Sequence, residues 1–194
     1  MKGIIVFVKN PELGKVKTRL AISMGDKKAL EIYNKLLAYT KEILLQLSNV
    51  KKCIYYSSFI DRKDDWINDQ FEKHIQSKGD LGERMNNAFS EVFDSCEHVI
   101  IIGSDCPQLT ASHLNDAFES LKNHNVVIGP SQDGGYYLLG MDKHYPELFQ
   151  GIEWSTNTVL SATIQKAKDK HLKISELETL SDIDFEEDWI KYGF

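Results

Sequence analysis

The chain has 194 residues, of which 42% are apolar and 27% charged, and its formal net charge is −6. This length fits one domain over residues 1–194, and the composition is that of an ordered, soluble globular protein. The acidic balance argues against a non-specific nucleic-acid binder, because such proteins need a basic surface that neutralises phosphates.

Cysteine and histidine usage gives no metal or disulfide motif. Cys53, Cys96 and Cys106 lack CxxC spacing and make an odd count, which argues against a disulfide framework or a zinc knuckle and favours the reducing cytoplasm. The six histidines are scattered without a paired zinc-binding spacing, so none receives a role. The N-terminal apolar run is too short for a signal sequence or a membrane span.

Strands and helices are predicted to alternate along the chain. The expected strands are 3–8, 51–58, 73–77, 98–103, 125–130, 135–141 and 171–177, and the expected helices are 26–47, 79–95, 110–123 and 155–170. Asp26 is the expected N-cap of the first helix, and Thr110 or Ser112 that of the third. This order predicts an α/β fold with a mostly parallel central sheet and helices on both faces, with ligands at the carboxyl ends of the strands.

An acid follows one buried strand directly. Asp105 stands after the apolar run "HVIIIG", in the stretch "SDCPQL". At the rim of a parallel sheet, one or two carboxylates together with phosphate oxygens can hold Mg²⁺. Asp105 is therefore the first candidate metal ligand, and the alternative is a turn cap before Pro107.

Two glycine-containing segments carry charges suited to a nucleotide. The first, "KNPELGKVKTRL", places Lys15, Lys17 and Arg19 beside Gly14 after the first strand, where amides and cations could hold a diphosphate. It matches neither a Walker loop nor a dinucleotide fingerprint, and a solvated basic loop is the alternative. The second, "GDLGERM", sets Asp80, Gly82 and Arg84 at a predicted helix start, where backbone can approach a base or ribose.

Two acidic segments later in the chain complete the candidate site. In "PSQDGGYYLLG", Asp133 precedes two glycines and two aromatic residues, and it could deprotonate an acceptor hydroxyl; a Gly-Gly hairpin turn is the alternative. In "SDIDFEEDW", alternation places Asp182 and Asp184 on one side of an extended segment, so either could join Asp105 at a metal. An acidic surface strand is the alternative there.

Taken in order, "FVKNPELGKVKTRL", "GDLGERM", "GSDCPQL", "GPSQDGGYYLLG" and "SDIDFEEDW" resemble a bacterial family of small GT-A-fold glycosyltransferases associated with arsenosugar biosynthesis. The resemblance spans nearly the whole chain and implies a nucleotide-diphospho-sugar transferase architecture, similar to molybdopterin and phospholactate guanylyltransferases. It implies that the first loop approaches nucleotide phosphates, that "GDLGER" lies near the base or ribose, and that Asp105 binds a divalent metal. The late "DID" is similar to a DIDTPEDL-type ending, with Phe185 in place of the usual threonine.

From these observations we expect a cytoplasmic transferase that uses Mg²⁺ or Mn²⁺. It would move a sugar from a nucleotide-diphospho-sugar donor to a small hydroxylated acceptor, with Asp133 as the base. One alternative on the same fold is a guanylyltransferase-like nucleotidyltransferase that joins a nucleoside triphosphate to a phosphorylated substrate and releases pyrophosphate. The other is a non-catalytic nucleotide-binding regulator.

Overall fold

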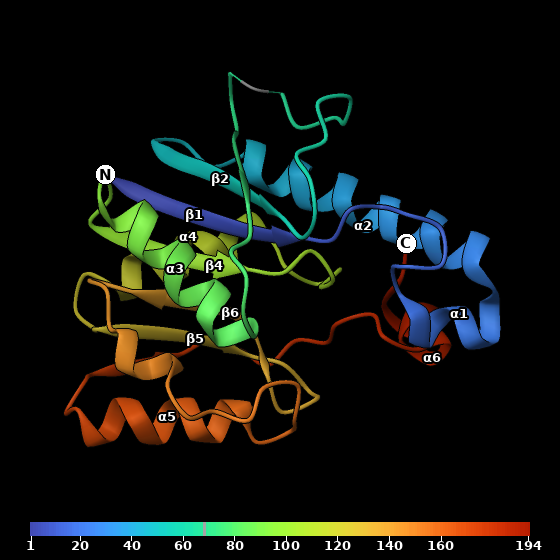
Figure 1. The fold of residues 1–194 in the computed structure, drawn as a ribbon. Coiled ribbons are helices and arrows are strands. Elements are labelled where there is room, and N and C mark those ends of the chain that lie inside the picture. Colours follow the sequence, from blue (N-terminus) through green and yellow to red (C-terminus); the bar gives the residue numbers. More distant parts are fainter. Residues whose placement is uncertain (68) are drawn as a thin grey trace.

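The computed structural model describes residues 1–67 and 69–194, which form a seven-stranded sheet with helices on both faces (Figure 1). The strands are β1 Lys2–Val8, β2 Val50–Tyr56, β3 Glu72–Ile75, β4 His98–Ile102, β5 Val126–Pro130, β6 Tyr136–Met141 and β7 Ile174–Glu176. The helices are α1 Thr18–Met24, α2 Asp26–Leu45, α3 Leu81–Phe93, α4 Ala111–Ser120, α5 Val159–Asp169 and α6 Glu186–Tyr192, with a short 3₁₀ helix, η1, at Pro146–Phe149.

The sheet is mostly parallel, as the alternation of elements predicts. Its order is β3-β2-β1-β4-β6-β5-β7, and β6 alone among the described strands runs antiparallel to its neighbours β4 and β5. A tight turn between β5 and β6 reverses the chain, with the Ser131 amide donating to the Gly135 carbonyl at 3.1 Å. Gly134 in this turn has a φ of 89°, a conformation that favours glycine. The Gly-Gly hairpin turn that the sequence offers as the alternative for this segment is therefore present.

The side chains of β1 explain the two layers of helices. Ile4, Val6 and Val8 pack in the core between the sheet and helices α2 and α4, whereas Ile5 packs on the opposite side, with α3 and α5. Strand side chains alternate between faces, so a strand with apolar residues at nearly every position has to be covered on both sides. The carboxyl ends of the parallel strands β1 and β4 therefore lie side by side at the same rim of the sheet (Figure 1).

Helix ends differ from the sequence prediction in three places. The last three residues of the basic loop begin α1, a helix that the sequence does not predict, and the single residue Gly25, with a φ of 80°, joins α1 to α2. Gly25 therefore takes the N-cap position predicted for Asp26, which is the first helical residue instead. Helix α5 begins at Val159 rather than at Ser155, whose φ of 64° cannot continue a helix.

The acidic tail also differs, since it turns into helix α6 after Asp184. Thr110 is confirmed as the N-cap of α4, because its hydroxyl accepts from the His113 amide. The three cysteines are free, in agreement with the absence of a disulfide framework. Within residues 1–67 and 69–194, no helix combines the length and apolar character that crossing a bilayer requires.

Candidate functional site

The chain segment at residues 180–184 lies against the end of β4. The Ile183 amide donates to the Asp105 carbonyl at 3.0 Å, and the Leu180 amide donates to the Pro130 carbonyl at 3.1 Å. These bonds hold a late part of the sequence beside the loop that follows β4 and the end of β5. Asp182 and Asp184 are thereby brought close to Asp105, as the sequence predicts for a shared site.

A buried lysine joins two of these acids. Lys17 Nζ lies 2.8 Å from Asp105 Oδ2 and 3.7 Å from Asp184 Oδ1, and it donates to the Ile183 carbonyl at 2.6 Å. The Lys17 side chain is only 4% exposed. Its φ of 48° at the start of α1 turns the chain into the site. Arg19, the second residue of α1, reaches Asp184 Oδ2 at 3.0 Å.

The third acid, Asp182, has no such partner. Its carboxylate forms no hydrogen bond or ion pair with the described residues. Burial, and next the charge of Asp105, raise the pKa of the Asp182 carboxyl to about 7, whereas Lys17 acts in the opposite direction. A partly buried acid with a raised pKa of this kind is stabilised in its ionised form by a nearby cation.

The three carboxylates at the carboxyl ends of the strands form a set of ligands that fits Mg²⁺ or Mn²⁺. Asp105, Asp182 and Asp184 offer carboxylate oxygens, which these hard cations prefer over nitrogen or sulfur. Because the Asp182 carboxylate has no partner among the described residues, a cation can bind it without breaking an existing contact. The residues present therefore fit the metal that the fold resemblance implies.

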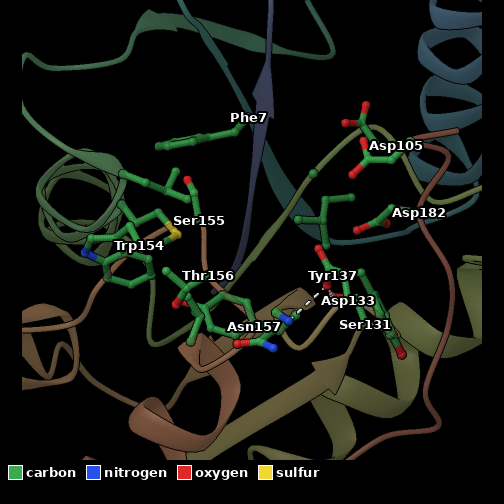
Figure 2. Close-up of a pocket in the computed structure, with 18 of the residues that line it drawn as sticks. Phe7, Asp105, Ser131, Asp133, Tyr137, Trp154, Ser155, Thr156, Asn157 and Asp182 are labelled. Carbon is green, nitrogen blue, oxygen red and sulfur yellow. Dashed lines mark hydrogen bonds between the residues drawn. The ribbon is translucent and has the colours of Figure 1, made fainter. Parts of the chain in front are cut away.

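A cavity of about 530 Å³, called the larger cavity below, opens beside these acids (Figure 2). Asp105, Asp133 and Asp182 line one part of it, and Phe7 and Trp154 line another. Among the described residues that line it, Arg19 is the one lysine or arginine, against four aspartates, of which Asp184 is the fourth. The cavity thus combines an acidic part with an apolar part.

Asp133 is held by its own turn. Its Oδ1 accepts from the Gly135 amide at 2.9 Å and from the Ser131 hydroxyl. Both bonds fall on the same oxygen, so Oδ2 has no hydrogen-bond partner in the described part of the chain. The turn and the site therefore coexist: the hairpin expected as an alternative also positions Asp133 at the cavity.

Trp154 forms a wall that the sequence analysis missed. A Cβ placed on Gly82 would lie 2.4 Å from its ring, so the indole packs directly on the backbone at the start of α3. Ser155, Thr156 and Asn157 follow it along the cavity (Figure 2). The sequence signal for this wall is the run "WSTN", one large aromatic and three polar residues, whose last three residues fall in a predicted helix.

A smaller cavity of about 490 Å³ adjoins the first and shares Arg19, Asp105 and Asp184 with it. It is richer in cations, because Lys9, Lys17 and Arg84 also line it. Arg84 donates through a guanidinium nitrogen to Gln76 Oε1 at 2.9 Å, which fixes the orientation of its planar head.

Four predicted residues lie outside both cavities. Gly14 and Lys15 belong to the exposed part of the first loop, and Lys15 is 69% exposed with its Nζ 2.8 Å from Glu12. Asp80 caps α3 by accepting from the Glu83 amide at 2.8 Å. Gly82 contributes through its contact with Trp154 rather than by lining a cavity.

Sequence comparison relates the chain to one bacterial family and to a group of curated enzymes. A family described as "Uncharacterized protein conserved in bacteria (DUF2064)" matches residues 42–156, more than half of the chain. The 2-phospho-L-lactate guanylyltransferase of Methanocaldococcus vulcanius is 24% identical over 177 residues, 88% of this chain and 74% of that protein. Its counterpart from Methanocaldococcus jannaschii is 30% identical over 132 residues, 66% of this chain and 54% of that protein. The chain thus spans about half of the second relative.

Solved structures confirm the nucleotide-diphospho-sugar transferase fold. A proposed nucleotide-diphospho-sugar transferase from Desulfovibrio desulfuricans G20 has a TM-score of 0.86 and 32% identity, covering 95% of this chain and 82% of that one. The inositol-1-phosphate CTP transferase of T. maritima has a TM-score of 0.65 at 18% identity, with coverage of 97% and 91%. A manganese complex of a protein from Mycobacterium tuberculosis H37Rv has a TM-score of 0.55 at 9% identity, with coverage of 98% and 96%. The last two share the fold alone.

Proposed function

The chain belongs to the bacterial DUF2064 family, and from that premise we propose that it is a metal-dependent nucleotidyltransferase. It would join the nucleotidyl group of a nucleoside triphosphate to a small phosphorylated acceptor and release pyrophosphate. The names of the curated relatives favour a guanosine nucleotide as the donor. Glycosyl transfer, the function expected first from the sequence motifs, becomes the second candidate.

One observation carries the proposal: Lys17 lies buried between Asp105 and Asp184 while the neighbouring Asp182 has no partner among the described residues. Acids of this kind at the carboxyl edge of a sheet suit a divalent cation with phosphate oxygens as its further ligands. When bound, Mg²⁺ or Mn²⁺ would supply Lewis-acid stabilisation of the charge that develops on the phosphates.

The residues of the smaller cavity provide the donor's binding groups. Lys17 and Arg19 would donate charge-assisted hydrogen bonds to phosphate oxygens, which hold a polyanion more strongly than neutral donors do. Arg84, fixed by Gln76, presents its remaining donors to the nucleobase or ribose. Gly14, Lys15 and Asp80 would act indirectly, through the shape of the loop and the cap of α3.

A specific feature of the larger cavity favours the second candidate. It combines four aspartates and one cation with the aromatic side chains of Phe7 and Trp154. An acceptor without a phosphate suits such a wall better than an anionic one, and Asp133 Oδ2 could then accept the proton of an acceptor hydroxyl. The motifs resemble a family associated with arsenosugar biosynthesis, which favours glycosyl transfer, and this association stays a prediction.

The products distinguish the two candidates. Nucleotidyl transfer from GTP, CTP, UTP or ATP with Mn²⁺ and a panel of phosphorylated acceptors releases pyrophosphate, which a pyrophosphatase-coupled phosphate assay detects. Glycosyl transfer from diphospho-sugars to hydroxylated acceptors releases a nucleoside diphosphate instead. Asp105→Asn is the control and should abolish either activity. Release of neither product, together with unaltered nucleotide binding in Asp105→Asn, would refute both and leave a nucleotide-binding regulator.

A further inference from the structure

Three side chains of metal-binding type lie together at the edge of the sheet, outside the cavities described above. They are Cys53 on β2 and Glu72 and His74 on β3, and one sulfur, one carboxylate oxygen and one ring nitrogen lie within 4.8 Å of one another. None of the three lines the larger or the smaller cavity. The candidate site is therefore separate from the site of the proposed function.

The parallel register of β2 and β3 brings these residues together. Cys53 lies opposite Glu72, and Tyr55 lies opposite His74. Because strand side chains alternate between faces, residues two apart point the same way, and all three ligands fall on one face. Cys53 and Tyr55 belong to the core that α3 covers. Sequence spacing alone contains no metal motif here, since the ligands come from two strands.

His74 has an unsatisfied nitrogen at this position. Its Nε2 is buried and has no hydrogen-bond partner within the described residues. Glu72 Oε2 lies 3.7 Å from this nitrogen, which is too long for a hydrogen bond. Two ligand atoms at about 2.1 Å from one tetrahedral zinc ion are about 3.4 Å apart. A cation between Glu72 and His74 would therefore satisfy both with little movement, and stacking on Tyr55 already fixes the His74 ring.

We propose that Cys53, Glu72 and His74 bind a thiophilic divalent cation such as Zn²⁺, with water as the fourth ligand. A sulfur, nitrogen and oxygen donor set suits Zn²⁺, whereas the all-carboxylate set at Asp105 suits Mg²⁺ or Mn²⁺. Such a cation ties the short edge strand β3 to β2.

Two features set the conditions of binding. Lys51 Nζ lies 3.0 Å from Glu72 Oε2 and competes with a cation for this carboxylate, although its hydrogen bond to Ser95 at 3.1 Å can remain. Burial raises the pKa of the Cys53 thiol to about 12, so the thiol is protonated in the metal-free protein. Metal uptake therefore transfers the thiol proton to solvent as the sulfur–metal bond forms.

Co²⁺ is the probe, because a cobalt–thiolate bond produces a near-ultraviolet charge-transfer band that a carboxylate site cannot produce. A stoichiometric amount of Co²⁺ should produce this band in the full chain, and Zn²⁺ should bleach it. The band should disappear in Cys53→Ala and persist in Cys96→Ala, the matched control, since Cys96 is likewise buried, at 5% exposure, but outside the ligand group. No band in the native protein, or equal loss in both cysteine variants, overturns the proposal.

A second variant guards against misfolding of the core substitution. His74 lies on the edge strand and is partly exposed, so His74→Gln should fold normally and weaken Zn²⁺ binding at least about tenfold, as measured by calorimetry. Asp105→Asn should leave the cobalt–thiolate band unchanged, because it alters only the carboxylate site. Native Zn²⁺ affinity in His74→Gln would overturn the assignment.

Discussion

Replacing Lys17 by Met tests whether one buried ammonium balances the acids at the strand ends. Its Nζ lies 2.8 Å from Asp105, 3.7 Å from Asp184 and 2.6 Å from the Ile183 carbonyl. Methionine keeps an unbranched stem of similar length and removes only the charge and its hydrogen bonds. The variant therefore leaves the carboxylates facing one another without their common counter-ion.

The expected magnitude follows from exposure. A hydrogen bond from a charged donor contributes about 1.5–3 kcal/mol, and leaving a fully buried charge unpaired costs about 3–5 kcal/mol. The side chains of Asp105 and Asp184 are 40% and 34% exposed, so water replaces much of the lost interaction. We expect the free energy of unfolding of Lys17→Met to fall by about 2–3 kcal/mol in the metal-free protein. Mn²⁺ should restore much of it, because the cation supplies the missing positive charge.

Urea unfolding with EDTA and with saturating Mn²⁺ measures both effects. Lys15→Met is the matched control, since this lysine lies in the same loop, is 69% exposed and pairs with Glu12. Its free energy of unfolding should change by no more than about 0.5 kcal/mol. The reasoning fails if Lys17→Met is as stable as Lys15→Met, or if Mn²⁺ stabilises the two variants equally.

Three further substitutions test other parts of the site. Asp182→Asn should stabilise the metal-free protein by up to about 4 kcal/mol above pH 7 and weaken Mn²⁺ binding. Because the folded-state pKa of about 7 exceeds the ordinary 3.8, the native acid lowers the free energy of unfolding as pH rises through this interval. Urea unfolding at several pH values should therefore show that the gain in stability vanishes near pH 4. Gly82→Ala should destabilise the protein by about 1–3 kcal/mol, because its Cβ displaces Trp154; an unchanged melting temperature would contradict this contact. Asp80→Ala should cost about 1 kcal/mol through loss of the helix cap and leave nucleotide affinity unchanged in calorimetry, whereas weaker binding would assign Asp80 a direct role.

The central strands and the first acid were predictable from local sequence. A strand buried on both faces consists of consecutive apolar residues, as β1 and β4 do, and such strands belong to parallel sheets. Ligands of parallel sheets bind at the carboxyl ends, so Asp105 could be placed at the rim from its position after β4 alone. Its role as a metal ligand stays a prediction.

What could not be predicted depends on contacts between distant segments. Helix α1 has seven residues and begins after Lys17, whose backbone is left-handed, so it is too short for a repeated pattern of apolar residues to predict it. The contact of Trp154 with Gly82 depends on how two loops pack, and neither residue has a local pattern that predicts it. The grouping of Cys53 with His74 depends on strand register, which the spacing of the residues in sequence does not contain.

The charge at the junction of the two cavities constrains the order of binding under the proposed function. Asp105, Asp133, Asp182 and Asp184 line the larger cavity, and Arg19 is the one cation among the described residues that line it. The phosphates of a nucleotide held by the cations of the smaller cavity meet Asp105 and Asp184, which line both cavities, and a divalent cation bound there removes the repulsion between phosphate and carboxylate. Burial and the charge of Asp105 raise the pKa of the Asp182 carboxyl to about 7, so binding of a cation to its ionised form competes with a proton near neutral pH. Under the proposed function we therefore expect the donor to bind as its metal complex, with an affinity that rises with pH until Asp182 is fully ionised.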